Sequence, residues 1–155
     1  MQIRPIGPQD TPRVQAFIAG ILDREFSDDR RAYAGTDLED PVRYYGGGKD
    51  LFLVAEKDGV IIGTVAIKED GPNAALLRRI FVSPAFRGQG YGDLLLRRAL
   101  AFCFDRRYQT VTFRGSDRMQ AALKLCLKEG FRETDAATFG GVTLRVLTKR
   151  LGPPA

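Results

Sequence analysis

Three β-forming runs joined by two short turn signals occupy the middle of the chain, and this pattern constrains the fold most strongly. Leu51 to Glu56 and Val60 to Lys68 are separated by Lys57-Asp58-Gly59, and an Asp-Gly pair accepts the positive φ of a tight hairpin turn. A second turn, Asp70-Gly71-Pro72-Asn73, precedes a third run from Ala75 to Val82. These segments predict an antiparallel meander of three strands.

The flanking segments alternate between helical and strand patterns. Before the meander we expect a short strand at Ile3 to Ile6, a helix that begins at Thr11-Pro12, and a looser stretch from Ser27 to Asp50 with a short helix. After it we expect a helix from Tyr91 to Arg107, a strand from Thr110 to Arg114, a helix ending at Gly130, and a hairpin of Phe131 to Ala137 with Val142 to Thr148. The prediction is an α/β (α+β) fold: a mixed, largely antiparallel sheet of about seven strands with helices on both faces.

Length and composition fit one domain. The chain has 155 residues, of which 44% are hydrophobic, so we expect a single domain over residues 1–150 and a short tail over 151–155. No apolar run approaches the roughly 18 residues of a membrane span, so we expect no membrane partner and a cytoplasmic location. Cys103 and Cys126 are not spaced as a metal or redox pair, which agrees with a reducing compartment and no metal.

The charged residues narrow the chemistry. With no histidine, the chain has no Ser-His-Asp relay and no imidazole for a metal. The net charge of +5 favours an anionic partner, whether nucleic acid, a membrane surface or a phosphorylated cofactor. The arginines occur mostly as scattered pairs without interleaved aromatic residues, so no nucleic-acid partner is expected. A nucleic-acid-binding module stays open as the weakest alternative.

The most informative stretch is Arg87-Gly88-Gln89-Gly90-Tyr91-Gly92, between a predicted strand and a predicted helix. Its glycines let the backbone turn sharply and approach a ligand, and the free N–H groups of a helix N-terminus bind phosphate oxygens. A Walker loop would continue with Gly-Lys-Ser/Thr, and a dinucleotide fingerprint would have G-x-G-x-x-G in a parallel unit. Neither matches, so we expect a pyrophosphate site of another kind. A tight turn without a ligand is the structural alternative.

These residues resemble the signature of the GNAT superfamily of acyl-CoA-dependent N-acyltransferases. The resemblance covers the strand Leu77 to Pro84, the loop Arg87 to Gly92, and the helix Ala122 to Gly130 followed by Phe131. It implies transfer of an acetyl group from acetyl-CoA to a primary amine of a small molecule, amino-acid-like in one reading, or of a peptide. Direct attack of the amine on the thioester is the implied mechanism. Homodimers are common in this superfamily.

The resemblance also implies the cofactor-binding residues. Backbone groups of the strand, chiefly of Ile80 and Val82 with Phe81 between them, pair with the pantetheine arm. The loop residues Arg87, Gly88, Gln89, Gly90, Tyr91 and Gly92 hold the pyrophosphate. A gap between the strands Ala75 to Val82 and Thr110 to Arg114 is implied, where the thioester meets the amine.

The chain departs from the family pattern at the catalytic positions. Many members carry a glutamate where this sequence has Leu76, so the base is sought among Glu25, Glu56 and Glu69 or left to solvent. Cys126 occupies the position of the tyrosine that protonates the thiolate, and Met119 that of an asparagine. A catalytic Cys126 and a small apolar packing residue are the two readings. These departures also leave open a non-catalytic acyl-CoA-binding sensor.

The acceptor is indicated only by scattered residues. Strand alternation predicts that Arg78 and Arg79 point to opposite faces, so Arg78 is a candidate for binding a substrate carboxylate. An ordinary surface ion pair is the alternative. Tyr44 and Tyr45 line an aromatic wall of the substrate site in one reading, and pack the early helices onto the sheet in the other.

Overall fold

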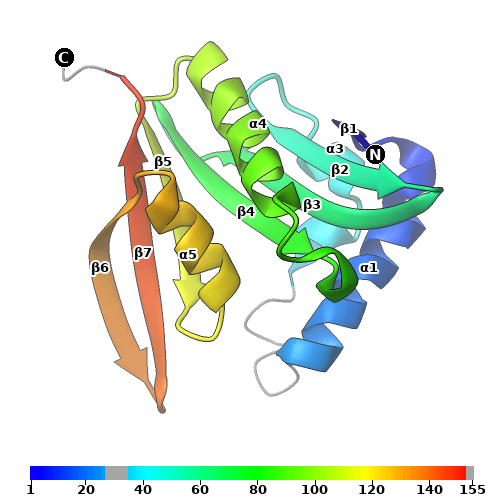
Figure 1. Cartoon of the computed structure of the whole chain (residues 1–155). Helices are drawn as coiled ribbons and strands as arrows, with labels where there is room; N and C mark the ends of the chain where they lie inside the picture. The colour runs from blue at the N-terminus through cyan, green and yellow to red at the C-terminus, as the bar shows by residue number, and fades with distance from the viewer. Residues whose placement is uncertain (27–34, 153–155) are drawn as a thin grey trace.

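A seven-stranded sheet organises the computed structural model, which describes residues 1–26 and 35–152 (Figure 1). Its strands are β1 (Gln2–Pro5), β2 (Leu51–Lys57), β3 (Val60–Glu69), β4 (Ala74–Val82), β5 (Thr110–Ser116), β6 (Arg132–Phe139) and β7 (Val142–Arg150). They lie in the order β1-β2-β3-β4-β5-β7-β6, and within this sheet β4 and β5 are the parallel pair. The predicted mixed, largely antiparallel sheet is confirmed.

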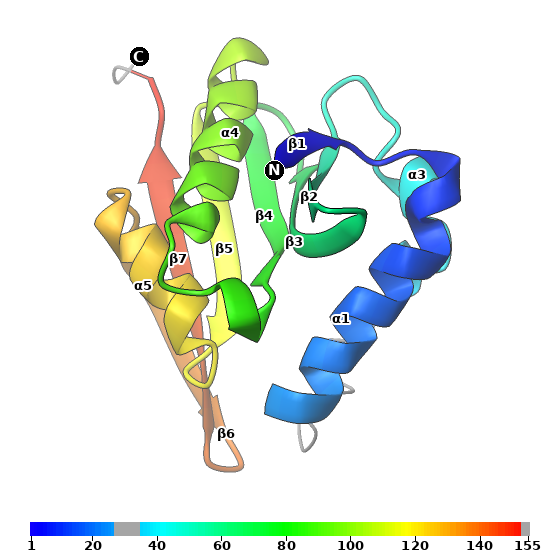
Figure 2. The ribbon, with the colours of Figure 1, turned by 45° about the vertical axis from the view of Figure 1, so that its right-hand side comes forward.

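Helices cover both faces of the sheet, as predicted. The helices are α1 (Thr11–Glu25), α3 (Pro41–Tyr44), α4 (Tyr91–Asp105) and α5 (Gln120–Lys128), and the short 3-10 turns are η1 (Pro8–Asp10), η3 (Thr36–Leu38) and η4 (Pro84–Phe86). Figure 2 shows α4 and α5 on one side of the sheet and α1 on the other. Among the described helices, none is long and apolar enough to cross a membrane.

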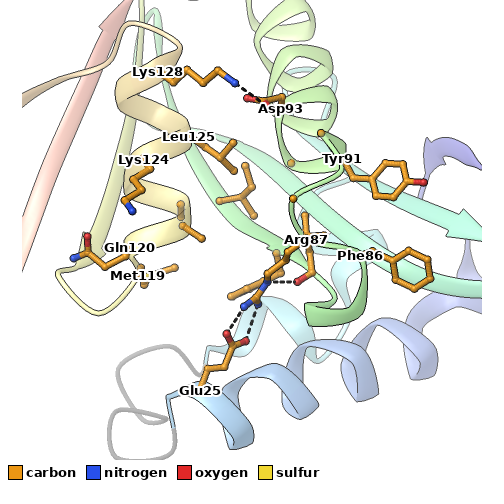
Figure 3. A pocket seen from close by; sticks show the side chains of 18 of the residues that line it. Glu25, Phe86, Arg87, Tyr91, Asp93, Met119, Gln120, Lys124, Leu125 and Lys128 are labelled. Carbon is orange, nitrogen blue, oxygen red and sulfur yellow. Dashed lines mark hydrogen bonds and ion pairs between the residues drawn. The ribbon is translucent and has the colours of Figure 1, made fainter.

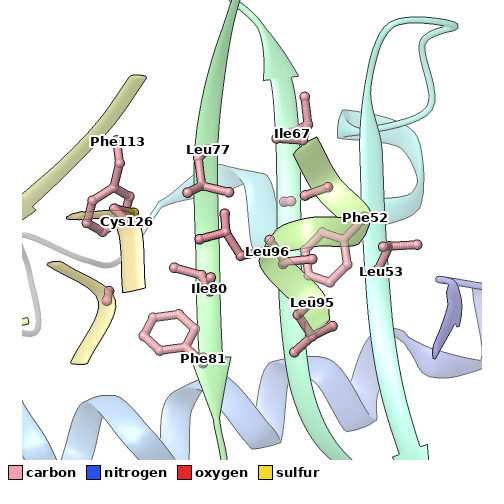
Figure 4. Packing of buried hydrophobic residues seen from close by; sticks show 14 of the residues in the cluster. Phe52, Leu53, Ile67, Leu77, Ile80, Phe81, Leu95, Leu96, Phe113 and Cys126 are labelled. Carbon is pink, nitrogen blue, oxygen red and sulfur yellow. The ribbon is translucent and has the colours of Figure 1, made fainter. Parts of the chain in front are cut away.

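The main core lies between the sheet and α4. The helix buries one apolar stripe, which consists of Leu95, Leu96, Ala99, Leu100 and Cys103. Figure 4 shows Leu95 and Leu96 packed over strand residues such as Phe52 and Ile67. Each such side chain contributes about 1.5–3 kcal/mol when it is fully buried. The core therefore fixes α4, and with it the loop that precedes the helix.

The sheet opens in its centre. β4 and β5 are paired only from Ala74 to Leu77 and from Thr110 to Phe113. Beyond these positions β4 continues to Val82 and β5 to Ser116, with no pairing between the two strands. We call this opening the splay. It lies at the gap that the resemblance implied.

A bulge lies in β4 next to the splay. The register slips between Thr64 and Ala66 of β3, so β4 carries one more residue than β3 at this point. Arg79 has a φ of +54°, and its carbonyl accepts a hydrogen bond from Thr64 Oγ1 at 2.7 Å. Bulges of this kind redirect the side chains of the strand that carries them.

The bulge brings two arginines to one carboxylate. Arg79 donates to Asp37 from Nε at 3.0 Å and from Nη2 at 2.7 Å, and Arg78 Nη1 lies 3.8 Å from Asp37 Oδ2. Both side chains therefore reach the same side of the sheet. The prediction that they point to opposite faces is wrong, because the bulge interrupts the alternation at Arg79.

Asp37 is a buried charge with several partners. Its side chain is 2% exposed, and Tyr45 Oη donates to it at 2.7 Å. Burial alone would raise the pKa of Asp37, but the hydrogen bonds from Arg79 and Tyr45 and the charges of the two arginines outweigh burial and lower it. The loose segment that precedes β2 thus supplies the counter-ion of the bulge.

Replacing Asp37 tests this interaction. Asp37→Asn removes the buried negative charge to which Arg79 donates two hydrogen bonds, so we expect the free energy of unfolding to fall by about 3 kcal/mol in urea denaturation. The control is Glu133→Gln, which removes the surface partner of Arg145 and should cost less than about 1 kcal/mol. Equal losses in the two variants would contradict a structural role for Asp37.

Candidate functional site

A cleft of about 610 Å³ opens between the N-terminus of α4, the end of β4 and helix α5. Figure 3 shows its walls, with α5 on one side, the glycine-rich loop on the other, and Glu25 of α1 at one end. The strand residues Ile80, Phe81 and Val82 line the cleft. Because these residues also border the splay, the cleft reaches the opening in the sheet.

The glycine-rich loop presents backbone donors to this cleft. Gly88 and Gly90 have φ values of +76° and +85°, a region that side-chain-bearing residues rarely adopt. Gly90 is the N-cap of α4 and provides no side-chain cap. The first N–H groups of a helix have no partner within it, and its dipole is positive at this end. The loop is therefore suited to bind an anion.

Gly92 serves a different purpose. A Cβ atom at Gly92 would lie 2.8 Å from Leu125 Cδ1, closer than carbon atoms pack. The missing side chain lets α4 and α5 approach each other at the cleft. In this motif Gly88 and Gly90 are needed for their positive φ, whereas Gly92 is needed because no side chain fits between the two helices.

Charged side chains add to the loop. Four cations, Arg87, Arg118, Lys124 and Lys128, line the cleft against the two carboxylates of Glu25 and Asp93. Lys128 Nζ lies 3.1 Å from Asp93 Oδ2, while Asp93 Oδ1 is buried without a hydrogen-bond partner among the described residues. The net charge is positive, which favours an anionic guest.

Arg87 connects the glycine-rich loop to Glu25 at one end of the cleft. Its Nε donates to the Val82 carbonyl at 3.0 Å, and its Nη2 donates to Glu25 Oε2 at 2.7 Å. Nη1 contacts the other Glu25 oxygen, and this pairing raises the pKa of Arg87. The end of α1 is thereby tied to the glycine-rich loop.

A family model described as the Acetyltransferase (GNAT) family matches residues 17–134. This chain belongs to that GNAT family. It is therefore one of a family of acetyl-transferring enzymes, and the resemblance read from the sequence is confirmed. The residues in the cleft fit the family's phosphate-bearing ligand, because the loop offers backbone donors and its walls offer cations.

Curated relatives match part of their own length. N-acetyltransferase 8F1 of Rattus norvegicus is 35% identical over 104 residues, which are 64% of this chain and 47% of the relative. N-acetylaspartate synthetase of Danio rerio is 34% identical over 113 residues, 70% of this chain and 40% of the relative. The chain thus spans less than half the length of these two relatives.

Solved structures share the fold at low identity. A GNAT acetyltransferase from Staphylococcus aureus Mu50 superposes with a TM-score of 0.83 at 21% identity, covering 97% of this chain and 99% of that chain. A putative acetyltransferase from Salmonella typhimurium, solved with its cofactor acetyl-CoA, gives a TM-score of 0.77 at 19% identity, covering 100% of this chain and 96% of that chain.

The structure brings most of the expected cofactor-binding residues of this GNAT protein to the cleft. The lining includes Ile80, Phe81, Val82, Arg87, Gly88, Gly90, Tyr91 and Gly92 but not Gln89. Sequence reasoning missed the cations Arg118, Lys124 and Lys128. The spacing of Lys124 and Lys128 by one helical turn was the available signal.

Of the three candidate bases, Glu25 is the one that lines the cleft. Glu56 lies 2.7 Å from Arg13 in an ion pair near β1, and Glu69 lies 3.9 Å from Lys49. Neither is among the lining residues, so the geometry gives no support to the interpretation of Glu56 or Glu69 as a catalytic residue.

The substrate candidates lie outside this cleft. Tyr45 is buried with its hydroxyl on Asp37, and Tyr44 packs edge-on against the Tyr45 ring with centroids 4.9 Å apart. This arrangement agrees with the packing reading of the two tyrosines. Arg78 approaches Asp37 on the face that carries η3, away from α4 and α5.

Cys126 is a core residue in the structure. It is fully buried, it lies beside Phe113 (Figure 4), and it does not line the cleft. Burial raises the pKa of the thiol to about 12. The geometry thus agrees with the packing reading and gives no support to a proton-donating role.

Replacing Cys126 should therefore affect stability more than catalysis. We expect Cys126→Ala to lower the free energy of unfolding by about 1 kcal/mol, because it removes buried volume. The pH profile of kcat should keep its shape on the alkaline side. If a folded Cys126→Ala variant loses the decline of kcat at alkaline pH, Cys126 is the acid that protonates the thiolate, and the packing interpretation is wrong.

Proposed function

We propose that this protein transfers an acetyl group from acetyl-CoA to a primary amine of a small molecule or peptide in the cytoplasm. The observation that carries the proposal is the cleft at the N-terminus of α4, where the positive-φ glycines Gly88 and Gly90 expose backbone donors among four cationic side chains. Family membership of residues 17–134 supports it. The relatives, by their names, are acetyltransferases or make an N-acetylated amino acid.

Specific residues would hold the cosubstrate. Backbone N–H groups from Gly88 to Gly92 suit the pyrophosphate, and Lys124 and Lys128 line the facing wall on α5. Backbone groups of Ile80 and Val82 have no β5 partner beyond the end of the pairing at Leu77, so we assign them to the pantetheine arm at the splay, where the Val82 carbonyl also accepts from Arg87 Nε. When bound, acetyl-CoA supplies an activated thioester, which needs mainly alignment with a deprotonated amine.

Glu25 is the carboxylate that we propose as proton acceptor for the amine. It lines the cleft at the end opposite Asp93 and Lys128 (Figure 3). It forms an ion pair with Arg87, and its side chain is 29% exposed, so water can reach the carboxylate and carry the proton away. For the thiolate we propose protonation from water, since Cys126 lies in the core.

The deciding experiment is a thiol-release assay with acetyl-CoA across a panel of amines, with mass detection of the products. Acetylated product supports the enzyme. Binding of acetyl-CoA without product from any amine would favour the alternative, a non-catalytic acyl-CoA sensor.

The variant Gly90→Val tests where acetyl-CoA binds. A β-branched residue disfavours the φ of +85° and places methyl groups over the donors, so we expect CoA affinity to fall at least about tenfold in calorimetric titration. Gly140→Val, at another positive-φ glycine on the β6–β7 turn, is the matched control for strain. If folded Gly90→Val binds CoA as tightly as the parent protein, acetyl-CoA does not bind at the glycine-rich loop.

The variant Glu25→Gln tests the role of the pair with Arg87. If the pyrophosphate competes with Glu25 for Arg87, the neutral amide should strengthen CoA binding several-fold, by about 1 kcal/mol, and lower kcat. Pantetheine carries no pyrophosphate, so its affinity should not change. Weaker binding of both ligands would mean that Glu25 only positions Arg87.

A further inference from the structure

The register of β4 and β5 places two arginines side by side where these strands part. Leu77 pairs with Phe113 at the last paired position, and both side chains point into the core on the α4 and α5 side (Figure 4). Arg78 and Arg114 follow directly, so alternation turns both to the opposite face. Paired parallel strands lie about 4.8 Å apart, so the two arginines flank the start of the splay.

The charges at this point are unbalanced. Asp37 is already shared by Arg78 and Arg79. Arg114 is exposed, and within residues 1–26 and 35–152 no carboxylate forms an ion pair with it. Arg78 thus has the carboxylate of Asp37 nearby, whereas Arg114 has no such partner among the residues that the structure describes. A further anion at the splay would relieve their repulsion, and a planar carboxylate matches the donor geometry of arginine.

Arg114 also borders a hollow on this face of the sheet. The hollow, about 380 Å³, has Arg114 on one side and Asp135 on the other, with an apolar floor made of Ala137, Leu144 and Val146. Arg114 pairs in register with Val146, which pairs in turn with Asp135. The cation and the carboxylate are thus separated by one strand, and the floor between them can receive an apolar group.

We propose that Arg78 and Arg114 bind the carboxylate of a free α-amino acid, which is the acceptor of the acetyl group. The inference rests on the proposed function and names its substrate class. In an α-amino acid the amine is two bonds from the carboxyl carbon. A carboxylate held at the start of the splay therefore leaves the amine within the opening, beside the β4 residues that line the cleft from the other face. The side chain lies on the floor of the hollow.

This site differs from the one read from the sequence. The sequence pattern indicates Arg78 as a carboxylate-binding residue and predicts only a strand for Thr110 to Arg114. The partner of Arg78 emerges from the register, because a parallel pairing that stops at Leu77 and Phe113 makes residues 78 and 114 equivalent. Asp37 fixes one arginine, while the exposed Arg114 is free to close on a ligand.

Direct binding tests the proposal without turnover. We would titrate the standard α-amino acids, each beside its α-carboxamide, into the full chain with CoA present, and follow binding by calorimetry. At least one amino acid should bind about tenfold or more tightly than its amide, since an arginine-carboxylate contact is worth that much. Arg114→Gln should abolish this difference while CoA affinity and the thermal midpoint stay unchanged.

The matched control is Arg145→Gln. Arg145 lies on β7 next to Val146 and pairs with Glu133, so this variant removes one charge from the same sheet but from its other face. It should keep the preference for the carboxylate. Equal binding of acids and amides by the parent, no binding of any amino acid, or an unchanged preference in Arg114→Gln would overturn the proposal.

Turnover separates this proposal from the proposed function. With a substrate that is acetylated, Arg114→Gln should raise KM for the acid about tenfold to a hundredfold and leave KM for its amide unchanged. If carboxylate-selective binding depends on Arg114 but no thiol is released with any amine, the transferase proposal fails and the binding site stands.

Discussion

The ion pair between Asp37 and Arg79 is the interaction on which the rest of the site depends. Arg79 occupies a left-handed conformation within a strand, which is unfavourable unless surrounding contacts maintain it. Two hydrogen bonds to Asp37 and one from Thr64 to the Arg79 carbonyl supply those contacts. Together these contacts stabilise the bulge. The bulge is the point at which the register of β4 with β3 shifts, next to the splay.

The same ion pair connects distant parts of the chain. Asp37 belongs to η3, forty-two residues before Arg79, and Tyr45 joins the carboxylate from beyond α3. The segment before the meander is therefore attached to the central strand by polar contacts, in addition to the packing of Tyr45 in the core. Removal of these contacts would free both the segment and the bulge.

The sequence contained enough information for the fold but only part of the site. Short-range signals predict the elements: Asp58-Gly59 makes the hairpin turn, and Gly130 ends α5 with a φ of +93°. The loop Arg87 to Gly92 indicates a phosphate site because its chemistry is local. The bulge was not predictable, since a slip in register depends on the partner strand and on Asp37. For the same reason, alternation misplaces Arg79, and no local pattern marks Arg114, because its neighbour on β4 depends on the register of the two strands.

Gly92 determines how the cleft behaves before anything enters it. A Cβ atom at this position would collide with Leu125, and surface pairs join the same two helices, Lys128 to Asp93 and Arg97 to Glu129. Contacts within the protein thus set the distance between α4 and α5, so the cleft has its width before a ligand binds. A ligand that enters this cleft has little rearrangement of the walls to drive, and its affinity should report the fit of its own groups rather than the work of closing the protein around it.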